Sequence, residues 1–257
     1  VVASEDKTVR IYDTRSRQVL RTLSGLSAKV SSARYSPDGS RIVTASADKT
    51  AKIHDAQSGG LLATLSGHSA ELYAAEYSPD GNRIVTASAD QTAKIYDAQS
   101  GKLLATLVGH SAAVVSASFS RDGRRVVTAS QDKTARVFEL ATSKLLFTLI
   151  GHQGALSSAR YSHDGIRIVT ASADKTVRLW DADRGQLLAT LIGHSEAVLD
   201  AEFGSDDRRV LTASADRTVR LFDVAAEARS SAELKKLLAC HSDAALGDVG
   251  LPRVADA

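Results

Sequence analysis

Short runs in which apolar and polar residues alternate recur along the whole chain, each separated from the next by a turn sequence. Between residues 71 and 107 the runs are ELYAAEYS, RIVTAS, AKIYD and KLLATL, and the segments between them include PDG, ADQT and AQSG. Alternation with a period of two predicts half-buried strands, and clusters of Pro, Gly, Asp and Ser predict tight turns. No intervening segment is long enough for a crossover helix, so the four strands must pair antiparallel as a meander.

This four-strand unit returns every 42 residues without an insertion or a deletion. The step is shown by one aspartate in each unit: Asp6, Asp48, Asp90, Asp132, Asp174 and Asp216. A shift of a single residue would turn the core face of a strand outward, so every unit must occupy the same place in the fold. A lone sheet cannot bury two apolar faces, whereas copies stacked around an axis can. The sequence therefore predicts an all-β fold, a β-propeller of four-stranded antiparallel blades with six repeat units visible.

The period ends near residue 224, so we expect a propeller over residues 1–224 and a separate tail over residues 225–257. In the tail, Ser230 and Glu233 form a capping-box pattern before three leucines at helical spacing, which predicts a short helix followed by an extended segment. The tail can also be aligned as a degenerate outer strand with His241 in a Gly-His turn. The first unit lacks its first strand, so we expect six blades closed by the tail, or part of a seven-bladed propeller with further repeats upstream.

Four short motifs recur at fixed places in the unit: GH before the first strand, SPDG after it, SAD-KT after the second, and an aromatic-Asp pair ending the third. With the period, they make the chain resemble the WD-repeat family of the bacterial, highly regular type. The resemblance implies a propeller that acts as a platform for other proteins. It is a weak guide to the particular function, because one fold hosts many functions.

The resemblance also implies a buried hydrogen-bond chain in each blade, here called the clasp, that runs through His, Asp, Thr and Trp. The fifth copy has all four residues: His152, Thr170, Asp174 and Trp180. Three other copies have the first three members: His68, Thr86 and Asp90; His110, Thr128 and Asp132; His194, Thr212 and Asp216. Their aromatic residues are Tyr96, Phe138 and Phe222, and the second copy has Leu26 at the His position. The same residue types form hydrolase triads, but repetition in four copies favours a structural role.

In the resembled family, partners most often dock on the face that bears the GH and Asp turns. Mapped onto this chain, the docking positions include Glu5, Lys29, Glu71, Tyr73, Val115, Gln131 and Leu199. Copies that are nearly identical elsewhere differ at these positions. Tyr73 is the best single candidate, because an aromatic ring with a hydroxyl is a typical interface anchor.

Composition removes several other classes of function. Cys240 is the only cysteine, which excludes an internal disulfide framework and a cysteine-rich zinc site. The net charge of +2 argues against a dedicated nucleic-acid binder. No phosphate loop, dinucleotide fingerprint or calcium loop is present, so we expect no cofactor, no metal and no small-molecule ligand.

No apolar run approaches the length of a membrane span, and we expect a cytoplasmic protein. The chain contains no Met and is expected to be a piece of a longer one.

These observations predict a non-catalytic scaffold that binds a protein or peptide, as the sensor or recruitment module of a larger bacterial signalling protein. Two alternatives remain: an enzyme with its active site in the central channel, and a propeller that binds nucleic acid. Against the enzyme, we expect the positions nearest the axis to be largely Ala, Ser and Val. Against nucleic acid, aromatic residues are few and most occupy regular strand positions.

Overall fold

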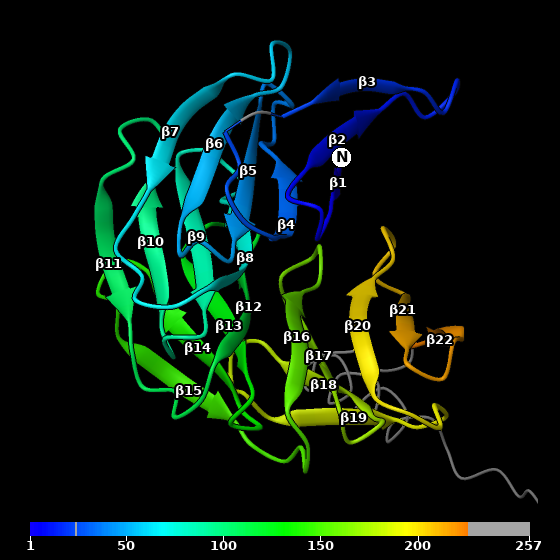
Figure 1. The fold of residues 1–257 in the computed structure, drawn as a ribbon. Coiled ribbons are helices and arrows are strands. Elements are labelled where there is room, and N and C mark those ends of the chain that lie inside the picture. Colours follow the sequence, from blue (N-terminus) through cyan, green and yellow to red (C-terminus); the bar gives the residue numbers. More distant parts are fainter. Residues whose placement is uncertain (24, 226–257) are drawn as a thin grey trace, which may run out of the picture.

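The computed structural model describes residues 1–23 and 25–225, which form β-strands joined by turns, with no helix among them. The strands form six antiparallel sheets in sequence order around a common axis, and these are the blades of a β-propeller (Figure 1). Blades 2 and 3 consist of β4 (Val30–Tyr35), β5 (Arg41–Ser46), β6 (Ala51–Asp55), β7 (Leu61–Leu65), β8 (Leu72–Tyr77), β9 (Arg83–Ser88), β10 (Ala93–Asp97) and β11 (Leu103–Leu107). Blades 4 and 5 consist of β12 (Val114–Phe119), β13 (Arg125–Ser130), β14 (Ala135–Glu139), β15 (Leu145–Leu149), β16 (Leu156–Tyr161), β17 (Arg167–Ser172), β18 (Val177–Asp181) and β19 (Leu187–Leu191).

The two end blades have three strands each among the described residues. Blade 1 consists of β1 (Val2–Ala3), β2 (Val9–Tyr12) and β3 (Val19–Thr22), and blade 6 of β20 (Val198–Phe203), β21 (Arg209–Ser214) and β22 (Val219–Asp223). By its register against β2, β1 corresponds to the second strand of a complete blade. Within residues 1–23 and 25–225, blade 1 therefore has no inner strand and blade 6 has no outer one. The helix predicted in the tail, the alternative strand with His241 and closure by the tail all lie outside the described residues.

The hydrophobic core lies between successive blades rather than inside any one of them. Val43, Ile53 and Leu65 on one face of blade 2, for example, pack against Leu72 and Ile84 of blade 3. The same layer recurs between blades 3 and 4, 4 and 5, and 5 and 6. Alternation along each strand supplies both faces, so blades 2 to 5 bury apolar side chains on both sides.

Arginines at the start of several second strands join neighbouring blades at the end of the ring away from the GH turns. Arg41 Nη1 donates to the carbonyl oxygen of Ala98 at 3.2 Å, and Arg125 Nη1 donates to that of Ala182 at 2.9 Å. Arg167 of blade 5 donates in the same way to the carbonyl oxygen of Val224 at 3.2 Å. A guanidinium offers several donors in a fixed plane, so it satisfies carbonyl groups left at the ends of strands.

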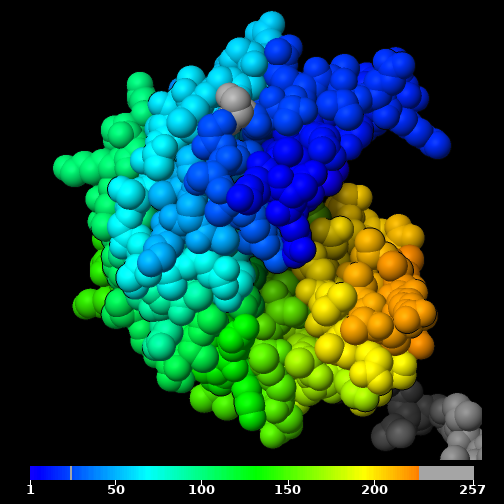
Figure 2. Space-filling model, in the orientation of Figure 1, coloured from blue at the N-terminus to red at the C-terminus, as the bar shows by residue number. Residues whose placement is uncertain are grey.

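The part of the ring that the described residues form is open between blade 6 and blade 1 (Figures 1 and 2). Leu211, Val219 and Leu221 of blade 6 are 40%, 65% and 55% exposed. Their counterparts one repeat earlier, Val169, Val177 and Leu179, are at most 1% exposed because blade 6 covers them. The face of blade 6 that corresponds to the buried face of blades 1 to 5 is therefore not covered by any other described blade.

We expect the same truncation to have very different effects on these two faces. Leu179→Ala removes fully buried atoms and leaves a cavity, so it should lower the free energy of unfolding by about 2–5 kcal/mol. Leu221→Ala at the equivalent position should cost less than about 1 kcal/mol, because the side chain is mostly exposed. Urea titrations of the two variants provide the comparison. Equal losses would mean that the face of blade 6 is covered in solution.

Candidate functional site

Four blades contain the same buried arrangement of His, Asp and Thr at the end of the ring that bears the GH turns. In each, His Nδ1 lies 2.7–2.8 Å from an Asp Oδ2, and His Nε2 lies 2.8 Å from a Thr Oγ1. The residues are His68, Asp90 and Thr86 in blade 3; His110, Asp132 and Thr128 in blade 4; His152, Asp174 and Thr170 in blade 5; and His194, Asp216 and Thr212 in blade 6. The structure therefore brings together the clasp residues named from the sequence.

The proton positions in the clasp follow from what each group can donate. A carboxylate only accepts, so Nδ1–H donates to the Asp, and Nε2 accepts from the Thr hydroxyl. Burial lowers the pKa of His68, His110 and His152, more than the neighbouring carboxylate raises it, which favours the neutral imidazole. Burial alone would raise the pKa of Asp90, but hydrogen bonds from Thr92, His68 and the Ser69 amide hold it at about 2.

The aspartate also ties two turns together. Asp174 Oδ2 accepts from the Gln153 amide at 2.9 Å, and its Oδ1 accepts from the Thr176 amide at 3.0 Å. The first amide belongs to the turn before β16, and the second to the turn between β17 and β18. One carboxylate therefore fixes the start of a blade to its second hairpin.

The chain of hydrogen bonds in the clasp of blade 5 includes one residue more than the chains in blades 3, 4 and 6. Trp180 Nε1 donates to Thr170 Oγ1 at 2.9 Å, so the chain of hydrogen bonds runs from Trp through Thr and His to Asp. At the same position the Tyr96 hydroxyl donates to the Ser66 carbonyl oxygen at 3.1 Å, and Phe138 has no donor. All three rings are nearly fully buried against the preceding blade. The apolar contact is therefore common to these blades, and the indole bond belongs to blade 5.

In blade 2, Lys52 of β6 takes the place of the clasp histidine as the partner of the aspartate. The sequence pattern did not predict this exchange of partners. Lys52 Nζ lies 2.7 Å from Asp48 Oδ2 and 2.8 Å from Thr50 Oγ1, and its side chain is nearly buried. Ser27 Oγ also donates to Asp48 Oδ2, at 2.6 Å. The sequence did contain one signal for this exchange, which is Leu26 at the His position of the second copy. Leucine cannot form a hydrogen bond with the Asp48 carboxylate, so that carboxylate needs another partner.

The clasp hydroxyls are not placed for chemistry on a substrate. Thr86, Thr128, Thr170 and Thr212 are at most 1% exposed. A nucleophile must reach the reacting atom, and these oxygens already lie within hydrogen-bond distance of the imidazole. The arrangement supports the fold of each blade.

The expectation that the axis is lined largely by Ala, Ser and Val is wrong at one position of the inner strands. That position holds Arg34, Glu76, Ser118, Arg160 and Glu202. Glu76 accepts from Ser118 Oγ of the next blade at 3.0 Å and interacts electrostatically with Arg160 two blades away. Arg160 Nη2 also lies 3.1 Å from Asp200 Oδ2. Charged side chains can line the axis because opposite charges on different blades compensate one another.

Four of the predicted partner-binding residues surround one recess on the face that bears the GH and Asp turns. Glu5, Lys29, Glu71 and Tyr73, from blades 1, 2 and 3, line a volume of about 450 Å³ together with Ala3, Val30 and Ser31. Lys29 Nζ forms an ion pair with Glu5, and the Tyr73 hydroxyl donates to Glu71 Oε1 at 2.9 Å. We call this recess the rim recess.

The charges of the rim recess are coupled. The hydrogen bond from Lys29 lowers the pKa of Glu5, and the same bond raises the pKa of Lys29. Burial, followed by the hydrogen bond to Glu71, raises the pKa of Tyr73. At neutral pH the recess therefore carries two carboxylates, one ammonium and a protonated phenol, beside the apolar surface of Val30.

The other three predicted residues lie outside the rim recess. Val115 is half-buried and packs against the core between blades 4 and 5. Gln131 is exposed in the turn after β13. Leu199 is 56% exposed on the open blade 6.

Neither a metal cluster nor a membrane-spanning helix is found in the described part of the chain. Residues 1–23 and 25–225 contain no group of three or more His, Cys, Asp or Glu side chains arranged to hold a metal ion. In the same residues there is no helix long and apolar enough to cross a membrane.

We expect removal of one clasp hydroxyl to cost more in blade 5 than in blade 4. Thr170→Val leaves both His152 Nε2 and the Trp180 indole N–H unsatisfied, which should cost about 1–3 kcal/mol. Thr128→Val leaves only His110 Nε2 without its partner and should cost about 1 kcal/mol less. Denaturant titrations of both variants measure the difference. Equal losses would show that the indole bond adds no stability.

We also expect acid to destabilise the fold in two stages. The pKa values of His68, His110 and His152 are lower in the folded state than the ordinary 6.5, so the unfolded chain binds more protons. Their contribution to stability is complete above pH 6.5 and is lost as the pH falls toward the folded values. The lowered pKa values of Asp90 and Asp132 add to the stability of the fold above pH 3.8, which is the ordinary pKa of Asp. This contribution is lost as the pH falls toward their folded pKa of about 2. Urea titrations over this range test the sign, and a free energy of unfolding that rises on acidification below pH 6.5 would contradict it.

A comparison with protein-family models matches the chain five times to the WD domain, G-beta repeat, at residues 17–55, 59–97, 101–139, 143–181 and 185–223. Each match begins near the outer strand of one blade and ends with the third strand of the next, so the family unit spans the junction between two blades. No curated protein matches the chain. The matches cover most of the sequence and repeat with the same 42-residue step as the blades of the structure, and the chain is a member of the WD-repeat family.

Proposed function

We propose that this chain is a non-catalytic scaffold that binds a protein or peptide in the rim recess, as the sensor or recruitment module of a larger, cytoplasmic bacterial signalling protein. WD repeats generally mediate protein–protein interactions, and that general role is the starting point. The observation that carries the proposal is the recess itself. Four residues from three blades, which the resemblance to WD repeats implied as docking positions, line one concave surface.

The composition of the rim recess suits a peptide side chain. Tyr73 offers an aromatic face, and Glu5, Glu71 and Lys29 offer charges of both signs. Interface anchors are typically aromatic residues surrounded by polar groups that fix orientation. The residues lie at the ends of strands held by buried cores, so a partner would meet a surface that is already ordered.

The central-channel enzyme is supported less well. The groups that resemble a catalytic triad are buried in the clasps, and the charges near the axis are engaged with one another.

We expect Tyr73→Ala and Glu71→Lys each to weaken binding of a partner peptide by at least about 1 kcal/mol, roughly five-fold, while the melting temperature stays nearly unchanged. Peptides selected from a random displayed library against the whole chain serve as ligands, and fluorescence anisotropy measures Kd. Ala155→Lys is the matched control, because Ala155 occupies the position of Glu71 two blades further on and does not line the recess.

The control variant should bind like the unmodified chain. If Tyr73→Ala and Glu71→Lys also bind like the unmodified chain, the partner docks elsewhere and the rim recess is not the site. If no peptide is selected against the chain, the scaffold proposal itself loses its support.

A further inference from the structure

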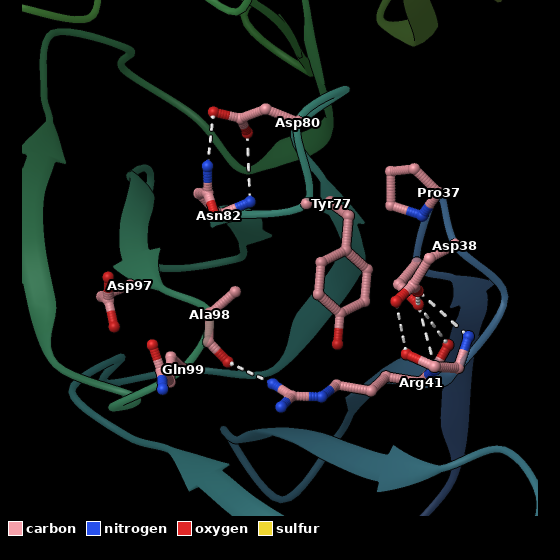
Figure 3. Close-up of a pocket in the computed structure, with 12 residues that line it drawn as sticks. Pro37, Asp38, Arg41, Tyr77, Asp80, Asn82, Asp97, Ala98 and Gln99 are labelled. Carbon is pink, nitrogen blue, oxygen red and sulfur yellow. Dashed lines mark hydrogen bonds between the residues drawn. The ribbon is translucent and has the colours of Figure 1, made fainter.

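Two equivalent pockets lie between blades on the end of the ring opposite the rim recess. The first, here called the Tyr77 pocket, has a volume of about 340 Å³ between blades 2 and 3 (Figure 3). The second, the Tyr161 pocket, has a volume of about 300 Å³ between blades 4 and 5. Tyr73 is the second residue of β8 and lines the rim recess, whereas Tyr77 is the last residue of β8, so the two kinds of site are on opposite faces.

The hydroxyl of Tyr77 is buried and has no hydrogen-bond partner among the described residues. The residue is only 6% exposed, and burial raises the pKa of its phenol to about 12, so the hydroxyl keeps its proton. The hydroxyl end of the ring points into the pocket, on the side of Arg41 (Figure 3). The Tyr161 hydroxyl is also buried without a partner among those residues. A buried phenol oxygen normally has a partner, so both pockets contain polar groups that a ligand could satisfy.

Packing does not require these hydroxyls. The equivalent residues between blades 3 and 4 and between blades 5 and 6 are Phe119 and Phe203, which are as well buried as Tyr77. At Phe203 the chain's own Arg167 places its guanidinium carbon 5.0 Å from the ring centroid. This position of the repeat can therefore hold a guanidinium against the aromatic ring.

Both pockets are rich in carboxylates. Asp38, Asp80 and Asp97 line the Tyr77 pocket with Arg41 as the single cation. The hydrogen bond from Ser36, with others from Ser40, lowers the pKa of Asp38 to about 2, so this group stays ionised at neutral pH. The Tyr161 pocket is lined by Asp122, Asp164 and Asp183 with two arginines. The surplus of negative charge in both pockets selects for a cation.

We propose that the Tyr77 and Tyr161 pockets each receive an arginine side chain of a protein partner, independently of the rim recess. The guanidinium donates one N–H to the phenol oxygen and others to the carboxylates at the mouth of the pocket. Its planar set of five donors can reach several acceptors at once, whereas an ammonium is a point charge. The volume of each pocket is sufficient for an arginine side chain.

The test uses the whole chain labelled with ¹³C at the ζ carbon of tyrosine, a signal that responds to hydrogen bonding at the hydroxyl. The probe is Nα-acetyl-arginine amide, and the neutral control is Nα-acetyl-citrulline amide, which has nearly the same shape. Tyr77→Phe and Tyr161→Phe assign the signals and remove the acceptor, with Phe119 and Phe203 as evidence that the repeat accepts this residue. Tyr35, at the same place in blade 2 but 40% exposed, reports contact with the probe in general.

We expect the arginine probe to shift the Tyr77 and Tyr161 signals until they saturate. The citrulline probe should bind at least about five-fold more weakly than the arginine probe. The double variant lacks both reporting signals, so its affinity for the arginine probe is measured by isothermal titration calorimetry. That affinity should fall by a similar factor, with an unchanged melting temperature. If Tyr77 and Tyr161 shift no more than Tyr35, the pockets hold only ordered water and the proposal is wrong. Equal shifts with arginine and citrulline would also overturn it. Both outcomes leave the peptide site in the rim recess untouched, because its variants lie on the other face.

Discussion

The structure depends on one constraint: a four-stranded sheet with two apolar faces must be covered on both sides. Val43, Ile53 and Leu65 are nearly inaccessible only because the next blade lies over them. The blade that covers them has a second apolar face of its own, which the following blade must bury, and the same holds for each blade around the ring. The strict period follows, because a shift of one residue would expose every core residue of a strand at once. The uncovered face of blade 6 shows what each blade looks like without a neighbour.

The clasps and the arginines order the two ends of this stack. At one end, each nitrogen of a neutral buried imidazole has a hydrogen-bond partner, a carboxylate on one side and a hydroxyl on the other, and the carboxylate also holds two turns. At the other end, Arg41 and Arg125 bind carbonyl groups of the next blade. Because the cores hold the strands, the residues at both ends are free to vary, and the rim recess and the two tyrosine pockets lie there.

The strands and the clasps could be predicted because both depend on residues that recur within one repeat. Alternation placed the strands, and the resemblance to WD repeats implied that the recurring His, Thr and Asp form the clasp. Features that join different blades could not be predicted in this way. The compensated charges around Glu76 and the orphan hydroxyl of Tyr77 depend on which side chains neighbouring blades bring close. The rim recess was predicted only as separate positions, because its concave shape arises from three blades.

Hydrogen exchange of backbone amides tests most directly whether mutual covering holds the blades. Strands covered on both faces, such as β9, β13 and β17, should exchange slowly and through a common opening, because uncovering one blade exposes the next. Strand β21, which is hydrogen-bonded on both sides but has one exposed face in blade 6, should exchange faster than its equivalent β17 in blade 5. Equal protection of β17 and β21 would contradict this, because the stability of a blade would then not depend on the neighbour that covers it.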